Sequence, residues 1–215
     1  MYDLNRIHAA PRGLAAAFVV AVSLGFSAPV SAAENGEKAG TFIRALASEA
    51  IQSLANEDVS RDDRIERFRK LFNGHFATRT IGRFVLGRYW KKAWKDEQQE
   101  YLGLFEDLMV VSYVDRFAKY AGKNLNVVKI QIDKGKDTIV FTQIPRETGK
   151  PVTVLWRVRE FRDVLRILDV IVEGVSMSQT MRSEFASIIR ANGGKVSGLI
   201  VSLREKTATL KASVK

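Results

Sequence analysis

The stretch that decides the fold is residues 126–174, NVVKIQIDKGKDTIVFTQIPRETGKPVTVLWRVREFRDVLRILDVIVEG. Its apolar residues recur at every second position, as in Val128, Ile130 and Ile132, which is the period of a strand with one buried face. Short turns divide the stretch into four expected strands, residues 128–133, 138–144, 152–159 and 164–173. We therefore predict a four-stranded antiparallel meander whose strand order is set by local hairpins.

Helical periodicity flanks this meander on both sides. Before it, apolar residues spaced three and four apart predict a helix from about Phe42, a second capped by Ser60, a short third from Thr78 and a long fourth capped by Asp96. After it, residues 179–191 and 196–203 show the same spacing. This order predicts a single α+β domain in which the N- and C-terminal helices pack on a curved four-stranded sheet.

We expect residues 1–33 to be a cleavable signal peptide. Arg6 and Arg12 precede an uncharged apolar run, residues 14–26, which is too short to span a bilayer and is followed by small residues. The alternative is an uncleaved membrane anchor. One domain then occupies residues 34–206, and residues 207–215 form a tail that we expect to fray. The chain has no cysteine, so the domain depends on an apolar core even if it is exported.

The formal net charge of +10 favours an anionic partner. For an exported protein, anionic lipid headgroups or an acidic protein surface suit better than nucleic acid, which we do not expect to bind. The alternative is that the charges only keep the surface solvated, since they are spread along the chain. Trp90 and Trp94 form the one aromatic cluster among bases. We interpret them as a packing pair on one helical face rather than a base-stacking platform.

Residue patterns of common active sites are missing from the sequence. His75 is the one histidine beyond the predicted signal peptide, so zinc sites built from Cys and His are excluded. The phosphate-binding patterns Gly-x-x-x-x-Gly-Lys-Ser/Thr and Gly-x-Gly-x-x-Gly do not occur, nor does the Gly-x-Ser-x-Gly motif of serine hydrolases. Adjacent acids such as Glu106 and Asp107 point apart on a helix. We therefore expect no enzyme activity, no metal and no cofactor.

Two motifs carry a resemblance to a known family. Leu86-Gly-Arg-Tyr-Trp90 precedes the long helix, and Asp169-Val-Ile-Val-Glu-Gly-Val-Ser176 ends the meander, followed by Arg182 and Phe185. In this order and spacing they make residues 42–206 similar to the MlaC, or toluene-tolerance, family of periplasmic phospholipid-binding proteins. Residues 164–168 lack a tryptophan or lysine expected in that pattern, so the hopanoid-associated HpnM branch of the family remains an alternative.

The resemblance implies a fold of the nuclear-transport-factor-2 or cystatin-like group, with a bound phospholipid as cargo and no cofactor. It also implies a soluble periplasmic shuttle that maintains the lipid asymmetry of the outer membrane. Its partners would be an outer-membrane lipoprotein–porin complex and an inner-membrane ABC transporter with its membrane-anchored substrate-binding subunit.

Periodicity suggests which residues would contact the cargo. The expected fourth strand is apolar on both faces, with Val164 grouped with Leu168, Val170 and Val172, and Ile167 grouped with Leu165 and Ile171. The second face lines a cavity or is covered by the terminal helices. We predict that the long helix and the sheet contact lipid through Phe105, Leu108, Met109, Val111, Phe141, Val154, Trp156, Leu168, Val170 and Val172.

Two other classes of protein stay open at this point. One is an enzyme on a similar cone-shaped fold, which would combine Tyr113 or Tyr120 with Asp107 or Asp115 and would need a buried acid of raised pKa. The other is a basic adaptor that binds a partner surface without a ligand.

Overall fold

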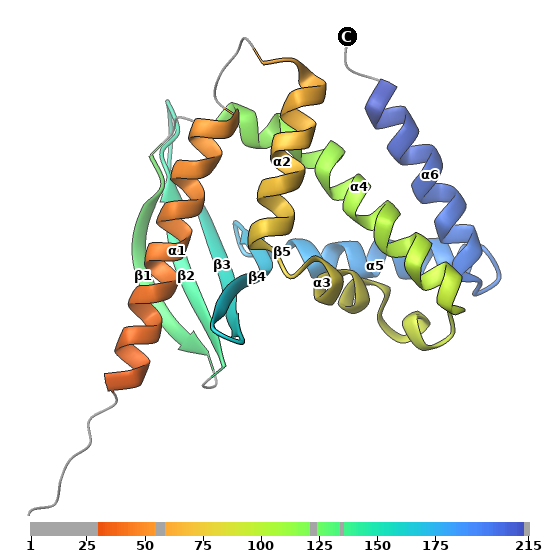
Figure 1. Cartoon of the computed structure of the whole chain (residues 1–215), viewed down its shortest axis with the longest axis horizontal. Helices are drawn as coiled ribbons and strands as arrows, with labels where there is room; N and C mark the ends of the chain where they lie inside the picture. Colours follow the sequence, from red (N-terminus) through yellow and green to blue (C-terminus); the bar gives the residue numbers. More distant parts are fainter. Residues whose placement is uncertain (1–29, 55–58, 121–123, 134–135, 213–215) are drawn as a thin grey trace, which may run out of the picture.

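The computed structural model describes residues 30–54, 59–120, 124–133 and 136–212. Most of the predicted signal peptide lies outside these residues and stays a prediction. The described chain forms an α+β domain (Figure 1). Its elements are α1 (Val30–Leu54), α2 (Arg61–His75), α3 (Thr78–Leu86), the 3-10 helix η1 (Gly87–Lys91), α4 (Lys95–Tyr120), β1 (Asn126–Asp133), β2 (Asp137–Ile144), β3 (Val152–Phe161), β4 (Val164–Val172), β5 (Val175–Ser176), α5 (Met177–Ala191) and α6 (Val196–Ala212).

The strands form one antiparallel sheet in the order β1-β2-β3-β4-β5. The meander was predicted with four strands, and this count is wrong by one short element. β5 returns along the end of β4, with Val175 opposite Val172. Glu173 and Gly174 have φ angles of 50° and 83°, which builds the tight turn between them. A two-residue strand is too short to show alternation in the sequence.

A β-bulge in β4 changes which residues face the helices. Val158 pairs with Ile167 and Arg157 pairs with Asp169, so Leu168 is an extra residue without a partner on β3. Ile167 consequently shares the helix-facing side with Val158 and is 0% exposed. The prediction that Ile167 lies on the face opposite Val170 is therefore wrong.

The bulge confines this error to the first half of β4. Val164, which was predicted to share a face with Val170, is 45% exposed. Beyond the bulge, Val170 pairs with Trp156 on the helix-facing side, as predicted. One extra residue reverses which face the following side chains point to. A prediction that continues strict alternation through the bulge therefore assigns half of the strand to the wrong face.

Both margins of the sheet are irregular. Phe76 forms a parallel bridge with Ile167 of β4, and the N–H of Ala77 donates to the carbonyl of Ile167 at 2.9 Å. β5 covers the end of β4. On the other side, the pairing of β1 with β2 shifts between Val127 and Lys129.

Local hydrogen bonds explain where α2 begins. The hydroxyl of Ser60 accepts the N–H of Asp63 at 3.1 Å and donates to its carboxylate at 2.7 Å, which confirms the predicted cap. At the other end of the chain, α6 continues to Ala212, past Lys206 where fraying was predicted. Thr207 is only 4% exposed, so this last segment is packed rather than free.

The start of α4 differs from the prediction. The helix begins at Lys95, so Asp96 lies inside its first turn and is not the cap. The carboxylate of Glu97 accepts the backbone N–H of Trp94 at 3.0 Å. This bond satisfies a donor that the helix itself leaves free.

One part of the domain, here called the helical half, consists of α3, the first half of α4, α5 and α6. Its interior is filled: Tyr101 and Phe185 are 0% and 3% exposed, and their rings meet edge to face at 6.2 Å. The Tyr101 hydroxyl donates to the carbonyl of Gly82 at 2.9 Å, and Leu199 of α6 is also 0% exposed.

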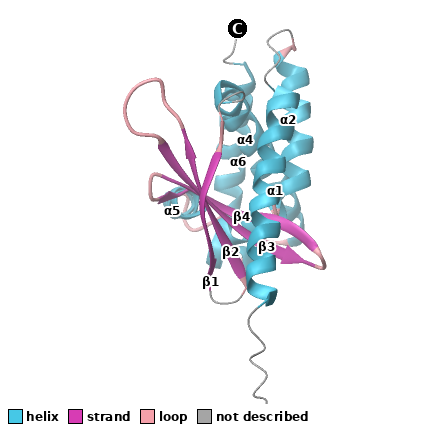
Figure 2. Ribbon diagram, turned by 90° about the vertical axis from the view of Figure 1, so that its left-hand side faces the viewer, coloured by secondary structure: helices cyan, strands magenta, loops and turns pink. Residues whose placement is uncertain are grey.

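The remaining part, here called the hollow half, consists of α1, α2, the second half of α4 and the sheet. Figure 2 shows α1 and α2 side by side on one face of the sheet. No helix among the described residues is long and apolar enough to cross a membrane.

Candidate functional site

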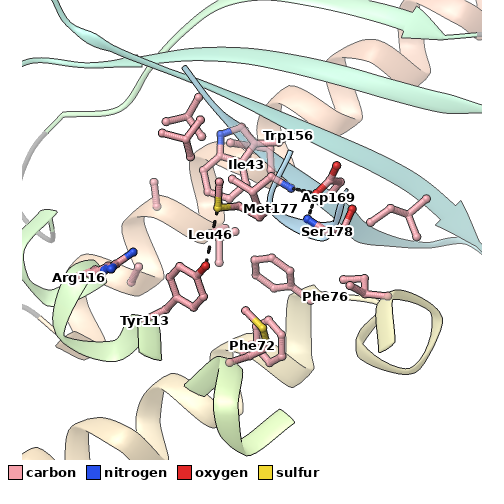
Figure 3. Close-up of a pocket in the computed structure, with 18 of the residues that line it drawn as sticks. Ile43, Leu46, Phe72, Phe76, Tyr113, Arg116, Trp156, Asp169, Met177 and Ser178 are labelled. Atoms are coloured by element: carbon pink, nitrogen blue, oxygen red, sulfur yellow. Dashed lines mark hydrogen bonds between the residues drawn. The ribbon is translucent and has the colours of Figure 1, made fainter. Parts of the chain in front are cut away.

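The hollow half encloses a cavity of about 400 Å³ between the sheet and helices α1, α2 and α4 (Figure 3). This volume lies within the range of roughly 300–1,000 Å³ that is usual for ligand pockets. The helices line it mainly with Ile43, Leu46, Ala47, Ala50, Ile51, Phe68, Phe72, Phe105, Met109 and Tyr113. The sheet and the segments beside it add Phe76, Ile81, Leu125, Ile144, Val152, Val154, Trp156, Leu168, Val170, Val172, Met177 and Met181.

Most of the residues predicted to contact cargo come together in this wall. The seven that line the cavity are Phe105, Met109, Val154, Trp156, Leu168, Val170 and Val172. They come from α4, β3 and β4, which the sequence placed opposite one another. The cavity therefore forms where the periodicity placed apolar faces against each other, although lipid contact at these residues stays a prediction.

The other three predicted residues do not line the cavity. Leu108 and Val111 are 5% and 3% exposed, so they are buried in the core rather than in the wall. At about 100° per residue, Leu108 lies about 60° and Val111 about 120° around α4 from Phe105, on the side away from Met109. Phe141 lies on the outer face of the sheet, where the ammonium of Lys129 is 5.2 Å from the centre of its ring.

Sequence reasoning missed the wall that α1 and α2 provide. The apolar stripe of α1 was recognised as a buried helix face, but nothing in it distinguished a cavity wall from an ordinary core. Phe72 and Phe76 also line the cavity, with ring centroids 4.7 Å apart. Large apolar residues at helical spacing are compatible with both outcomes, because the empty volume depends on how far apart the layers lie.

The polar atoms of the sheet wall are satisfied internally. The indole N–H of Trp156 donates to the hydroxyl of Thr142 at 3.0 Å, and this hydroxyl donates to the carbonyl of Val154 at 2.8 Å. Both side chains are buried. The wall therefore presents carbon to the cavity, because its donors are already occupied.

The second half of α4 gives the cavity a polar rim. The Tyr113 hydroxyl donates to the sulfur of Met177 at 3.7 Å, and burial raises the pKa of this hydroxyl above its ordinary value. The guanidinium of the exposed Arg116 lies 5.6 Å from the centre of the Tyr113 ring. No carboxylate among the described residues forms an ion pair with Arg116, so the rim carries a free positive charge (Figure 3).

The motif that ends at Ser176 fixes α5 beside the cavity. The Ser176 hydroxyl accepts the N–H of Gln179 at 3.1 Å and donates to the carboxylate of Asp169 at 2.6 Å. The other oxygen of this carboxylate accepts the N–H of Ser178 at 3.0 Å. Both oxygens of Asp169 are therefore used in holding the start of α5, which places Met177 in the cavity wall.

The other motif shapes the contact between α3 and α5. Gly87 ends α3 with a φ of 59°, and a Cβ atom there would lie 3.0 Å from the guanidinium of Arg182. Arg182 donates to the carbonyl of Phe84 at 3.0 Å and lies over its ring. The Leu86–Trp90 motif is thus part of the helical half rather than the cavity wall.

The acids considered for an enzyme are engaged elsewhere. Asp107 and Asp115 accept hydrogen bonds from arginines of α2 at 2.7 and 3.3 Å, while Tyr113 points to Met177. The side chain of Tyr120 lies outside the described residues. Within the described chain, no group of three His, Asp or Glu side chains is placed to hold a metal ion.

The fold and the site together define a class: α+β domains that enclose an apolar cavity between a sheet and its covering helices. Within that class, this chain belongs to the MlaC protein family, whose sequence pattern matches residues 44–205. The family predicted from the two motifs is thereby confirmed. The structure is similar to the phospholipid-binding protein from Ralstonia solanacearum, solved in complex with a phospholipid. The TM-score is 0.68 at 20% sequence identity, covering 80% of this chain and 97% of that one.

Proposed function

We propose that this protein is a phospholipid carrier that shields acyl chains in its cavity while the lipid crosses an aqueous compartment. The apolar cavity is the observation that carries the proposal. Each methylene exposed to water costs about 0.8 kcal/mol, so two chains of roughly 16 carbons cost on the order of 20 kcal/mol or more. Such a barrier prevents unassisted transfer and requires an enclosure of this kind.

The position of Arg116 suggests how the lipid is oriented. In this arrangement the acyl chains lie deep in the cavity, between Trp156 and Phe72. The phosphate of the headgroup lies at the rim, near Arg116. An unpaired guanidinium is a strong donor to phosphate oxygens. The rest of the headgroup then faces water, which permits cargo with different headgroups.

The size of the cavity bears on how the lipid enters. About 400 Å³ lies near the lower end of ordinary pockets, whereas a pocket at the upper end, roughly 1,000 Å³, would suit two long chains better. Loading therefore widens the hollow half, with α1 and α2 moving away from the sheet. The filled helical half keeps its packing during this change.

Membership of the MlaC family supports the cellular setting of this proposal. The carrier acts in the periplasm after export by the signal peptide of residues 1–33, and it works without catalysis or cofactor. It receives lipid from an outer-membrane lipoprotein–porin complex and delivers it to the membrane-anchored substrate-binding subunit of an inner-membrane ABC transporter. This exchange maintains the asymmetry of the outer membrane.

The same family membership leads us to place the fold of this carrier in the nuclear-transport-factor-2 or cystatin-like group.

A matched pair of variants on β4 tests the cavity. Val170→Gln places an amide in the wall, whereas Val164→Gln makes the same change on the exposed face of the strand. We expect purified wild type and V164Q to release one lipid per protein in denaturing mass spectrometry, and V170Q to release far less while remaining folded by circular dichroism. Equal lipid content in both variants would overturn the proposal.

The same spectra separate the remaining alternatives. A diacyl glycerophospholipid supports the proposal, and a polycyclic hopanoid assigns the protein to the hopanoid-associated branch of the family. Wild type that carries no lipid, and takes up none from vesicles, would instead favour an adaptor without a ligand.

A further inference from the structure

Trp94 is exposed to an unusual degree for an aromatic side chain. It is 79% exposed, whereas Trp90 is half-buried and Trp156 is 5% exposed. The expectation that Trp90 and Trp94 form a packing pair is therefore wrong for Trp94. Its backbone N–H serves the start of α4, but the indole ring has no role in the core. A single exposed apolar residue needs no partner by itself, so this ring is informative only together with the charges beside it.

The segment that leads up to Trp94 and Lys95 carries charges of one sign only. Residues 78–95 contain six basic side chains and no acidic one. The six, all exposed, are Arg79, Arg83, Arg88, Lys91, Lys92 and Lys95. None of them forms an ion pair with a carboxylate among the described residues. By contrast, Arg69 and Arg159 elsewhere are paired with acids at 2.7 and 2.6 Å.

The acids that follow in α4 only partly offset this charge. Glu97 accepts the N–H of Trp94, and Glu100 is paired with Arg204. Asp96 is exposed in the first turn of the helix. Residues 78–100 therefore still carry three more positive than negative charges. Figure 1 shows that α3, η1 and the start of α4 lie along one margin of the molecule, away from α1.

A tryptophan surrounded by lysines suits a lipid surface. Indole rings prefer the headgroup region of a bilayer, because the ring is apolar and its N–H finds hydrogen-bond partners there. Lysines near an anionic bilayer each add attraction, which screening by salt weakens. A ring that is 79% exposed can enter the headgroup region of a bilayer without any rearrangement of the chain, and the lysines beside it favour an anionic surface. Stacking on nucleic acid would need further free rings, and Arg83 covers Trp90 at 5.2 Å.

We propose that Trp94, with Lys91, Lys92 and Lys95 around it, docks this protein directly onto anionic lipid bilayers. This docking surface is separate from the cavity, since none of the four residues lines it. The inference goes beyond the proposed carrier function, because it gives the protein an affinity for membranes that needs no partner protein.

Sedimentation with vesicles tests the docking surface. We expect wild type to bind vesicles of phosphatidylglycerol and phosphatidylcholine at low salt, and to bind pure phosphatidylcholine weakly. Replacing Lys91, Lys92 and Lys95 by Gln should weaken binding to anionic vesicles about a hundredfold, at about fivefold per lysine. The control variant replaces three exposed lysines elsewhere, Lys136, Lys150 and Lys206, and so makes the same change in net charge.

Trp94→Ala tests the aromatic contribution. We expect it to weaken vesicle binding about tenfold, and to remove most of the blue shift of tryptophan emission that vesicles cause in the wild type. Phe161→Ala removes another exposed aromatic residue, 37% exposed, and should leave binding unchanged. Both variants should keep their co-purified lipid, so this test fails or succeeds independently of the carrier proposal.

Three results would overturn the docking proposal. They are no binding of wild type to anionic vesicles, equal loss of binding in the two triple-lysine variants, and binding unaffected by Trp94→Ala. The second result would mean that overall charge alone attracts the protein. Binding of the wild type to an acidic protein but not to anionic vesicles would assign Trp94 to a protein partner instead.

Discussion

The two halves of α4 face different kinds of interior. In the helical half, Tyr101 is 0% exposed, donates to a backbone carbonyl of α3 and packs against the ring of Phe185 in α5. In the hollow half, Met109 and Tyr113 line the cavity. Apolar side chains beside a void lack part of the dispersion contacts that a filled core provides. The hollow half is therefore shaped for a ligand at a cost in stability, which the helical half offsets.

The largest loss of unfolding free energy should follow from removing a buried ring in the helical half. Phe185→Ala removes a ring that is 3% exposed and packs on Tyr101. We expect the free energy of unfolding to fall by about 3–5 kcal/mol, measured by urea denaturation of lipid-free protein. A loss below about 1 kcal/mol would mean that the helical half does not act as a packed support.

Gly87→Ala should weaken the same half through the backbone. The φ of 59° is unfavourable for alanine, and the new methyl group would meet the guanidinium of Arg182. We expect a loss of about 1–3 kcal/mol in the same measurement. Gly103 is a matched control inside α4, where an added methyl group would have no other atom within 4 Å, so Gly103→Ala should stabilise the protein by up to about 1 kcal/mol. Equal effects of the two changes would contradict the strain at Gly87.

Tyr101→Phe should have a smaller effect with a pH signature. It removes the side-chain hydrogen bond to the Gly82 carbonyl, which costs about 1–2 kcal/mol at neutral pH. Burial raises the pKa of Tyr101 above its ordinary value, so the unfolded chain ionises first. Stability of the wild type should then fall as pH rises beyond about 10, and Y101F should show a shallower fall. Parallel pH profiles would count against this burial.

The smallest effect should be a difference in the loss of unfolding free energy between two valines of one strand, one in each kind of interior. Val154 and Val158 lie on the same face of β3 and are 5% and 1% exposed, but Val154 lines the cavity and Val158 does not. We expect Val158→Ala to cost about 2 kcal/mol and Val154→Ala about 1 kcal/mol in lipid-free protein, since contacts of Val154 are already incomplete. Identical losses would indicate that the cavity is closed in solution.

Much of the architecture was predictable because it rests on local patterns. Period-two alternation located β1 to β4, and the cap at Ser60 was confirmed. The bulge at Leu168 was not predictable, because one extra residue is invisible in a strand that is apolar on both faces. The cavity wall from α1 was missed for another reason: Ile43 and Leu46 are the same residues whether the space beside them is filled or empty. Lastly, Trp94 lies four residues after Trp90, a spacing that predicts one shared helical face. In the structure η1 ends at Lys91 and α4 begins at Lys95, so Trp94 lies between the two helices and is exposed.

The irregular margins of the sheet affect how the protein behaves when it is concentrated. A regular outer strand offers unpaired amide groups to a second chain and can template fibres. Here the Phe76 bridge and β5 occupy parts of one margin, and the irregularity beside Val128 breaks the other. Copies of this chain are therefore poorly suited to extend one another's sheets at these two margins.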